Sequence, residues 1–245
     1  MSMSAGKILV YGGSGAIGST TARALHSRGY ALHLVGRDAA KLDAVAREVD
    51  ATVTTGDVTD PALFERAANE ARSPLDGLLY AVGTINLKSL QRLTEADFLN
   101  DFRVNALGAA MAVRAALPAL KQSDRTPSIV LFSSVAVSQG FSFHASMGMA
   151  KGAIEGLTVS LAAELAPKIR INAIAPSLVR TPLAAGILSS EQTVSAIASL
   201  HALQRLGTPE DIAALAVYLL SPDAGWMTGQ VIGIDGGRSS TRTKG

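Results

Sequence analysis

The chain has 245 residues, of which 48% are hydrophobic and 17% are charged, so it can bury a sizeable core and does not have the composition of a disordered protein. It contains no cysteine, which excludes disulfides, thiolate catalysis and cysteine-ligated zinc. The formal net charge of +2 is too small to indicate a nucleic-acid partner, and we expect the basic residues Arg238, Arg242 and Lys244 to form a solvated tail.

The predicted elements alternate between short apolar or β-branched runs and longer helical patterns. The first apolar run begins at Ile8 and is too short for a signal peptide or a membrane span, so we expect a cytoplasmic protein that does not enter a membrane. Strands are predicted at residues 7–11, 31–35, 52–54, 75–81, 128–132, 170–174 and 230–234. Helices are predicted at residues 19–28, 38–49, 98–117 and 145–165, and another is predicted to open at Asp60-Pro61.

This alternation implies an α/β fold with a parallel sheet and helices on both of its faces. Right-handed crossovers then give the doubly wound Rossmann architecture, here with seven strands. The sequence shows no internal repeat, linker or low-complexity segment, so we predict a single domain over residues 1–245. Residues 183–206 are predicted to form a lid over the ligand cleft of this domain.

A glycine-rich turn at residues 12–18 follows the first strand and opens the first helix. Glycines let the backbone approach a pyrophosphate, and the N-terminus of a helix supplies N–H donors and the positive end of a dipole. A tight turn without a ligand is the alternative, but the position between strand and helix favours dinucleotide binding. The candidate phosphate-binding residues are Gly12, Ser14, Gly15, Ala16, Ile17 and Gly18.

This loop resembles the TGxxxGIG signature of the short-chain dehydrogenase/reductase family, with Tyr11 in place of the threonine and Ala16 in place of the middle glycine. Further segments match the family in chain order and extend the resemblance over nearly the whole chain. They are Asp57-Val58, Ala81-Val82-Gly83, Val104-Asn105 and Asp235-Gly236-Gly237. The resemblance implies hydride transfer with a nicotinamide dinucleotide, with Asp57 and Val58 beside the adenine and residues 81–83 along the cofactor.

The end of the second strand bears on the choice of dinucleotide. An acidic residue there would bind the ribose diol and favour NAD, but this chain has Gly36 followed by Arg37. Arg37 can pair with a 2′-phosphate, Ser14 can add a hydroxyl contact, and Asp38 is better placed as a helix cap. NADP is therefore the predicted cofactor, with NAD as the alternative if Arg37 is an ordinary exposed arginine.

The catalytic centre departs from the family at one position. The resemblance implies a tyrosine that exchanges the substrate proton, a lysine four residues later, a serine that binds the substrate oxygen and an asparagine that orders a water. Lys151, Ser134 and Asn105 occupy the last three places, and Ser133 is the neighbouring alternative to Ser134. Met147 occupies the place of the tyrosine, and a thioether cannot donate a proton.

Two interpretations of Met147 remain open. In enoyl-thioester reductases of this superfamily a similar methionine goes with a working tyrosine three residues earlier, a position held here by His144. Seven residues are about two helical turns, so His144 and Lys151 can share a face, and histidine exchanges protons near neutral pH. We therefore predict that His144 is the proton donor and that its activity as an acid strengthens below neutral pH. In the other interpretation, Met147 packs the core and the protein is a catalytically weak or inactive NADP-binding sensor or structural subunit.

The segment after the sixth strand resembles the family's Pro-Gly…Thr motif, with Ser177 in place of the glycine, which implies that Pro176 and Thr181 border the nicotinamide. The predicted lid carries Leu183, Ile187, Leu188, Val194, Ile197 and Leu200, and Phe141 and Phe143 border the same region. These residues predict a small-molecule substrate with apolar bulk, although packing of the lid on the sheet would also account for them.

The predicted activity is hydride transfer to or from a carbonyl, an alcohol or an activated alkene, with Asn105 typical of the carbonyl pattern and His144 with Met147 of the enoyl pattern. In the family, helices like those at 98–117 and 145–165 pair between subunits, so we expect a homotetramer or a homodimer. No metal site is predicted, because the four histidines lack the spacing of metal ligands.

Overall fold

The sheet contains seven parallel strands in the order β3-β2-β1-β4-β5-β6-β7. The computed structural model describes residues 5–241, and within this range the predicted seven-stranded parallel sheet is confirmed. The strand order changes direction between β1 and β4, which is where α/β sheets open a ligand crevice at the carboxyl ends of their strands. The strands are β1 (Gly6–Tyr11), β2 (Tyr30–Gly36), β3 (Thr52–Thr55), β4 (Gly77–Tyr80), β5 (Ser128–Phe132), β6 (Arg170–Pro176) and β7 (Val231–Ile234).

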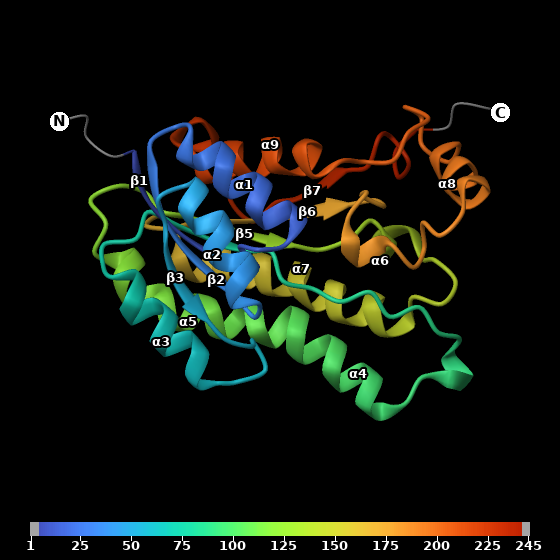
Figure 1. The fold of residues 1–245 in the computed structure, drawn as a ribbon, viewed down its shortest axis with the longest axis horizontal. Coiled ribbons are helices and arrows are strands. Elements are labelled where there is room, and N and C mark those ends of the chain that lie inside the picture. The colour runs from blue at the N-terminus through green and yellow to red at the C-terminus, as the bar shows by residue number, and fades with distance from the viewer. Residues whose placement is uncertain (1–4, 242–245) are drawn as a thin grey trace.

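Helices cover both faces of the sheet (Figure 1). One layer holds α1 (Ala16–His26), α2 (Ala39–Glu48) and α9 (Pro209–Leu220), and the other holds α3 (Ala62–Ala71), α4 (Glu95–Phe102), α5 (Gly108–Lys121) and α7 (Ala145–Leu165). A hydrophobic core lies on each face of the sheet. Alternate residues of a strand contribute to the two cores, because successive side chains point to opposite faces. Ile8 and Val10 pack in the first layer, whereas Leu9 and Tyr11 pack in the second. The short helices α6 (Ala136–Gln139) and α8 (Glu191–Ala198) lie at the end where the strands terminate (Figure 1).

Helix α9 is the one long helix of the described residues that the sequence analysis did not predict. Its start carries a strong signal, because Thr208 and Asp211 form a reciprocal capping box and Pro209 occupies the first helical position. Its apolar residues Ile212 and Val217 are buried against the sheet. The helix packs on α1, β5 and β6, so it completes the first layer.

Two predicted helices begin three residues earlier in the structure than the sequence pattern indicates. Helix α1 begins at Ala16 rather than residue 19, because the glycine loop leads directly into the helix without a side-chain cap. The helix predicted at 98–117 begins at Glu95, where Thr94 and Asp97 form a capping box, and it continues to Lys121. A π-helical segment, Arg103–Leu107, interrupts it and contains Asn105. The predicted cap of α2 is confirmed, since the Asp38 side chain accepts a hydrogen bond from the backbone N–H of Lys41 at 3.1 Å.

The expectation of a solvated C-terminal tail is wrong for Arg238, which is half-buried. Gly236 and Gly237 have φ values of 62° and 84°, a left-handed conformation that glycine adopts without strain, and they turn the chain back toward the ends of the strands. Arg242 and Lys244 lie outside the described residues. Within residues 5–241, no helix combines the length and the apolar character needed to cross a membrane.

Candidate active site

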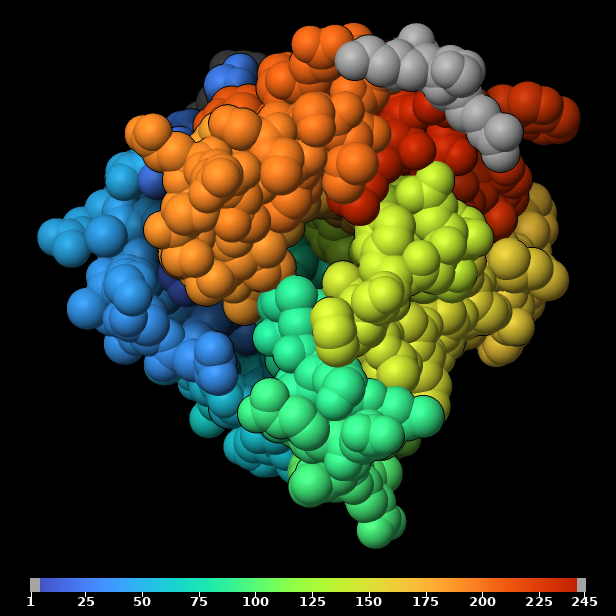
Figure 2. All heavy atoms as spheres, turned by 90° about the vertical axis from the view of Figure 1, so that its right-hand side faces the viewer, coloured from blue at the N-terminus to red at the C-terminus, as the bar shows by residue number. Residues whose placement is uncertain are grey.

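A cavity of about 620 Å³ opens beyond the carboxyl ends of β4, β5 and β6. Figure 2 shows it as a hollow bordered by the orange segment that carries α8, the green segment that follows β4, and the yellow-green segment between β5 and α7. Parallel strands bring their carboxyl ends to one edge of a sheet, which is why segments far apart in the sequence meet here. Nine of the predicted catalytic and cofactor-binding residues line it, namely Ile17, Ala81, Val82, Gly83, Ser134, His144, Lys151, Pro176 and Thr181.

The remaining candidates do not line this cavity. Asn105 is buried beside it, and the phosphate and adenosine candidates lie around the ends of β1, β2 and β3. They are Gly12, Ser14, Gly15, Ala16, Gly18, Arg37, Asp57 and Val58. Because β1 pairs with β2 on one side and with β4 on the other, these residues and the cavity occupy neighbouring parts of one edge.

The glycine loop has the geometry of a dinucleotide cradle. A side chain on Gly18 would clash with the carbonyl oxygen of Gly12, and a Cβ on Gly12 would lie 2.5 Å from the carbonyl oxygen of Ala81. Glycine is therefore required at both positions for the close approach of the loop, the helix and β4. No side chain caps α1 and no acidic residue lies in its first turn, so the free N–H groups at its start can receive a pyrophosphate.

At the predicted adenosine end of the site, Arg37 is exposed and only loosely paired, with 3.5 Å between its Nη1 atom and Oδ2 of Asp57. Asp57 is held by Thr59, whose backbone N–H and hydroxyl both donate to Oδ1 of the carboxylate. A Cβ built on Gly36 would lie 3.0 Å from the hydroxyl of Ser14. Arg37 and Ser14 therefore flank the end of β2, and the guanidinium keeps N–H groups that can bind an anion.

Lys151 and Asn105 converge beneath Gly83. A Cβ on this glycine would lie 3.4 Å from Nζ of Lys151 and 3.1 Å from Oδ1 of Asn105. The ammonium group donates to the carbonyl oxygen of Phe132 at 3.0 Å. The side-chain N–H groups of Asn105 donate to the hydroxyl of Thr84 and the carbonyl oxygen of Asp101, while its Oδ1 is buried with no hydrogen-bond partner among the described residues. This orphaned acceptor beside the lysine fits a bound water or a ligand hydroxyl.

Burial lowers the pKa of Lys151 from 10.5 to about 8, because an ammonium ion loses hydration inside the protein. The negative charge of Asp101 acts in the opposite direction and raises the pKa. Asp101 is itself 1% exposed, and no lysine or arginine forms an ion pair with it in the part of the chain that the structure describes. The lysine and the carboxylate thus act on each other without direct contact.

The two neighbouring serines have different surroundings. Ser133 donates to Oε1 of Glu155 at 2.7 Å and lies near the backbone carbonyl of Lys151, so its hydroxyl is committed to α7. The hydroxyl oxygen of Ser134 accepts a hydrogen bond from the backbone N–H of Ala136 at 3.2 Å, which leaves its own hydrogen free to donate. Ser134 is therefore the serine that can bind a ligand oxygen.

Met147 is buried and lines the cavity from the first turns of α7. Its sulfur lies 3.5 Å from the hydroxyl oxygen of Thr84, which in turn donates to Oδ1 of Asp101 at 2.7 Å. Thr84 and Asp101 are not among the site residues predicted from the sequence. A carboxylate one helical turn before Asn105, on a helix otherwise predicted to be apolar, was the available signal for Asp101.

His144 stands at the N-terminus of α7 and lines the same cavity as Lys151 and Ser134. Its Nδ1 atom lies 2.8 Å from the carbonyl oxygen of Ser142, which can only accept, so Nδ1 carries a hydrogen. In the neutral ring, Nε2 is then an unprotonated acceptor, and in the imidazolium it becomes a second donor. The ring also makes an edge contact with Phe141, with 5.4 Å between centroids.

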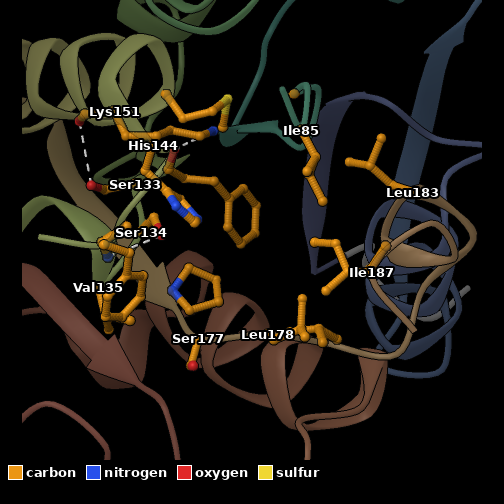
Figure 3. Close-up of a pocket in the computed structure, with 18 of the residues that line it drawn as sticks. Ile85, Ser133, Ser134, Val135, His144, Lys151, Ser177, Leu178, Leu183 and Ile187 are labelled. Carbon is orange, nitrogen blue, oxygen red and sulfur yellow. Dashed lines mark hydrogen bonds between the residues drawn. The ribbon is translucent and has the colours of Figure 1, made fainter. Parts of the chain in front are cut away.

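Apolar side chains form the wall opposite the polar residues. Figure 3 shows Ile85, Leu183 and Ile187 facing the side of the cavity that carries Ser134 and His144. Of the six apolar residues proposed for the lid, Leu183, Ile187 and Ile197 line the cavity, whereas Leu188, Val194 and Leu200 do not. Phe141 lines it and Phe143 is exposed outside it. The lining also includes Ile85, Leu87 and Arg238, which the sequence analysis did not place there.

The described residues contain no group of three or more histidine, aspartate or glutamate side chains that could hold a metal ion. The site therefore consists of a glycine cradle, an arginine at the end of β2, and a mostly apolar cavity with a serine, a histidine and a buried lysine.

Comparisons with known proteins identify the family. A family model described as enoyl-(acyl carrier protein) reductase matches residues 13–239. A tropinone reductase homolog of Arabidopsis thaliana is 33% identical over 239 residues, which cover 94% of this chain and 90% of the relative. An inactive 2-(S)-hydroxypropyl-CoM dehydrogenase 2 of Xanthobacter autotrophicus is 34% identical over 229 residues, which cover 89% of this chain and 99% of the relative.

Among solved structures, a short-chain type dehydrogenase/reductase from Mycobacterium ulcerans matches with a TM-score of 0.91 and 29% identity, covering 99% of this chain and 92% of the other. The chain therefore belongs to the short-chain dehydrogenase/reductase family of oxidoreductases, whose members bind NAD or NADP. The resemblance found in the sequence is confirmed at this level, and so is the Rossmann-type fold.

Proposed function

We propose that this protein is an NADP-dependent oxidoreductase that reduces a carbonyl or an activated alkene, or catalyses the reverse reaction, with His144 as the proton donor. One observation carries the proposal. His144 and Ser134 line the same cavity as the buried Lys151, and each keeps a polar atom available to a ligand. Met147, which has no proton to give, lines the same cavity.

The preference for NADP rests on the end of β2. Gly36 offers no carboxylate to a ribose diol, and the exposed guanidinium of Arg37 is held only by a 3.5 Å contact with Asp57. A 2′-phosphate placed between Arg37 and the hydroxyl of Ser14 would receive charge-assisted hydrogen bonds. The uncapped start of α1 would hold the pyrophosphate, and Thr181 and Pro176 would border the nicotinamide.

When bound, the cofactor supplies the hydride for the reduction, or accepts it in the reverse direction. Ser134 donates a hydrogen bond to the substrate oxygen and so stabilises the negative charge that develops there. The imidazolium of His144 then transfers the proton on Nε2 to the substrate and becomes neutral, while Nδ1 stays bonded to the carbonyl of Ser142. Lys151 would hold the cofactor ribose next to Asn105, whose free Oδ1 would accept a hydrogen bond from a water.

The residues that line the cavity indicate the kind of substrate. Ile85, Leu183 and Ile187 face the catalytic residues, so a small molecule with apolar bulk fits the volume between them. Residues 183–206 include α8 and lie over the end of the sheet, where they act as the lid of the domain.

The proposal is tested by titrating NADPH and NADH and then assaying aldehydes, ketones and enoyl thioesters between pH 5.5 and 8. We expect reduction to accelerate as the pH falls below neutral, because the reaction consumes the imidazolium form of His144. A His144→Gln variant should lose at least about a hundredfold in kcat, since general acids typically contribute this much. His26→Gln, on the exposed surface of α1, is the matched control. A flat pH profile with a fully active His144→Phe variant would refute the role of His144.

A second candidate function is a cofactor-binding sensor or structural subunit with little or no turnover. It is favoured by the burial of Met147 against Thr84 and by the likeness to a relative that is itself described as inactive. Tight NADPH binding without turnover on any of the three substrate classes would favour this second function.

We also propose that the protein assembles as a homodimer or homotetramer. Large apolar side chains are exposed on α4, on the π-helical segment and on α7, and α4 packs directly against α7. They are Leu99, Phe102, Leu107, Met149 and Val159, which are 39–59% exposed. An apolar surface of this kind on a helical layer is typical of a subunit interface. Multi-angle light scattering of the purified protein measures the assembly directly.

A further inference from the structure

Arg238 brings a positive charge into a cavity that has no negative one. The residues lining the cavity include no aspartate and no glutamate, and their basic side chains are Lys151, His144 and Arg238. Lys151 donates to the carbonyl of Phe132 and is the residue proposed to hold the cofactor ribose, and His144 is the proposed proton donor. Arg238 is therefore the permanent charge that remains available to a ligand at this surface.

The fold holds the backbone of Arg238 in place. Asp235 accepts hydrogen bonds from the backbone N–H groups of Gly237 at 2.9 Å and of Ser239 at 2.8 Å, which closes the turn around Arg238. Gln139 donates to the carbonyl oxygen of Arg238 at 3.1 Å and ties this turn to α6. The red C-terminal segment, which carries this turn, lies beside the yellow-green segment at the hollow in Figure 2.

Two contacts hold the guanidinium of Arg238, one with the ring of Phe141 and one with the hydroxyl of Ser177. Its Cζ atom lies over the Phe141 ring, 4.2 Å from the centroid, in a cation–π contact. Its Nη1 atom lies 3.4 Å from the hydroxyl oxygen of Ser177. The hydroxyl of Ser177 is the one hydrogen-bond acceptor of the guanidinium among the described residues, so its other N–H groups can bind a ligand.

Ser177 is itself fixed by His201, which is 2% exposed. Nδ1 of His201 lies 2.9 Å from the carbonyl oxygen of Ile197 and so carries a hydrogen, and Nε2 lies 2.9 Å from the Ser177 hydroxyl. In the neutral ring Nε2 must accept, so Ser177 donates to it and presents its lone pairs to Arg238. The side chain of Arg238 is thus positioned before any ligand arrives.

We infer that Arg238 is a specificity-determining residue that binds a carboxylate on the substrate, so that the substrate class is an amphipathic acid with an apolar body and a reducible group. A guanidinium edge with free N–H groups matches the two oxygens of a carboxylate. One arginine balances the single charge of a carboxylate, whereas a phosphate monoester carries almost two. The inference rests on the proposed function only in taking this cavity as the substrate site.

The electrostatic environment supports this assignment. Burial lowers the pKa of Arg238, and the charge of Asp235 opposes that shift. Both oxygens of Asp235 are bonded to backbone N–H groups, so this carboxylate compensates the guanidinium from a distance and does not saturate its donors. A partly desolvated cation with free N–H groups gains most from an anion that binds at short range.

The test is a binding measurement that needs no turnover. Phenylacetate and phenylacetamide, which share shape but differ in charge, are titrated by calorimetry into the full-length protein saturated with NADPH. We expect the wild type to bind the carboxylate at least about tenfold more tightly than the amide, a difference of about 1.4 kcal/mol. Arg238→Gln should abolish this preference, because glutamine carries no charge, and it should leave the Kd of the amide within about twofold, because the glutamine side chain can still donate a hydrogen bond to the amide carbonyl.

Two further variants sharpen the measurement. Arg238→Lys keeps the charge but loses the planar fork, so it should keep only part of the preference. Arg114→Gln, on the exposed surface of α5, should behave as the wild type. An unchanged preference in Arg238→Gln would overturn the inference, and so would tighter binding of phenyl phosphate than of phenylacetate.

Weaker binding of NADPH itself to Arg238→Gln, measured by nucleotide fluorescence without any acid present, would assign the arginine to the cofactor and also overturn the inference. A wild type that prefers the carboxylate yet reduces no substrate would refute the proposed reductase activity alone. The two proposals therefore fail separately.

Discussion

The sulfur of Met147 lies 3.5 Å from the hydroxyl oxygen of Thr84, at the inner edge of a buried polar network. The Thr84 hydroxyl donates to Asp101 at 2.7 Å and accepts from the side chain of Asn105 at 2.9 Å. Asn86 also donates to Asp101, at 3.2 Å. A thioether is a weak acceptor that gains little from such neighbours, so Met147 is an apolar side chain set against polar surroundings.

We predict that Met147→Tyr confers or increases carbonyl reduction. The phenol would point along the existing side chain into the cavity, near a lysine whose charge favours the phenolate. A new general acid should raise kcat on aldehydes or ketones by about a hundredfold, measured by the oxidation of NADPH. Met147→Leu, which matches the methionine in volume but carries no proton, is the control. Equal rates for the two variants would show that the cavity does not present the phenol to the substrate.

We predict that the stability of the protein rises with pH over the range in which Lys151 loses its proton. Burial lowers the pKa of this lysine from 10.5 in the unfolded chain to about 8 in the folded protein. Between these values the unfolded chain binds more protons, so the free energy of unfolding increases as the pH rises from about 8 to about 10.5. The full effect corresponds to roughly 3 kcal/mol.

Urea denaturation of the wild type and of Lys151→Met at pH 7, 8, 9 and 10 measures this effect as the change in their stability difference. Lys121→Met, at the exposed end of α5, is the control and should run parallel to the wild type. Asp101→Asn removes the charge that raises the pKa of Lys151, so the free energy of unfolding should begin to increase at a lower pH. Parallel curves for the wild type and Lys151→Met would contradict the lowered pKa.

Much of the fold was predictable because its signals are local. The strand at 128–132 and the helix at 145–165 have the predicted bounds, since an apolar run and an alanine-rich pattern each end at polar or proline-containing segments. The predicted residues around the ends of β1 to β6 meet at one edge because parallel strands place them there. Thr208 and Asp211 show that the missed helix α9 was also encoded locally, in a capping box.

The rest of the site depends on contacts that no local pattern reports. Thr84 and Asp101 are 17 residues apart and meet only because the segment after β4 folds back on α4. Arg238 and Phe141 are 97 residues apart, and the turn that carries Arg238 is held beside Phe141 by the hydrogen bond from Gln139. A basic residue near a chain end is typical of a solvated tail. No local sequence pattern therefore predicts that Arg238 lines the cavity.

We predict that Arg37 decides the preference for NADPH over NADH. Arg37 is 78% exposed at the side chain and shares its guanidinium with Asp57 only through the 3.5 Å contact, so Arg37→Gln should cost little stability. The same change removes a charged donor for a 2′-phosphate. We expect the Kd for NADPH to rise by about tenfold or more while the Kd for NADH changes by less than about twofold.

Both constants are measured by the fluorescence of the bound reduced nucleotide at fixed ionic strength, because screening weakens an exposed charge pair. Arg47→Gln, on the exposed side of α2, controls for the loss of one positive charge, since its Nε atom contacts only the backbone of Asp43 in the described structure. An equal loss of affinity for NADPH and NADH would mean that Arg37 binds a part of the molecule that both cofactors share. An unchanged affinity for both nucleotides would show that Arg37 does not bind the cofactor. The end of β2 would then not favour NADP over NAD.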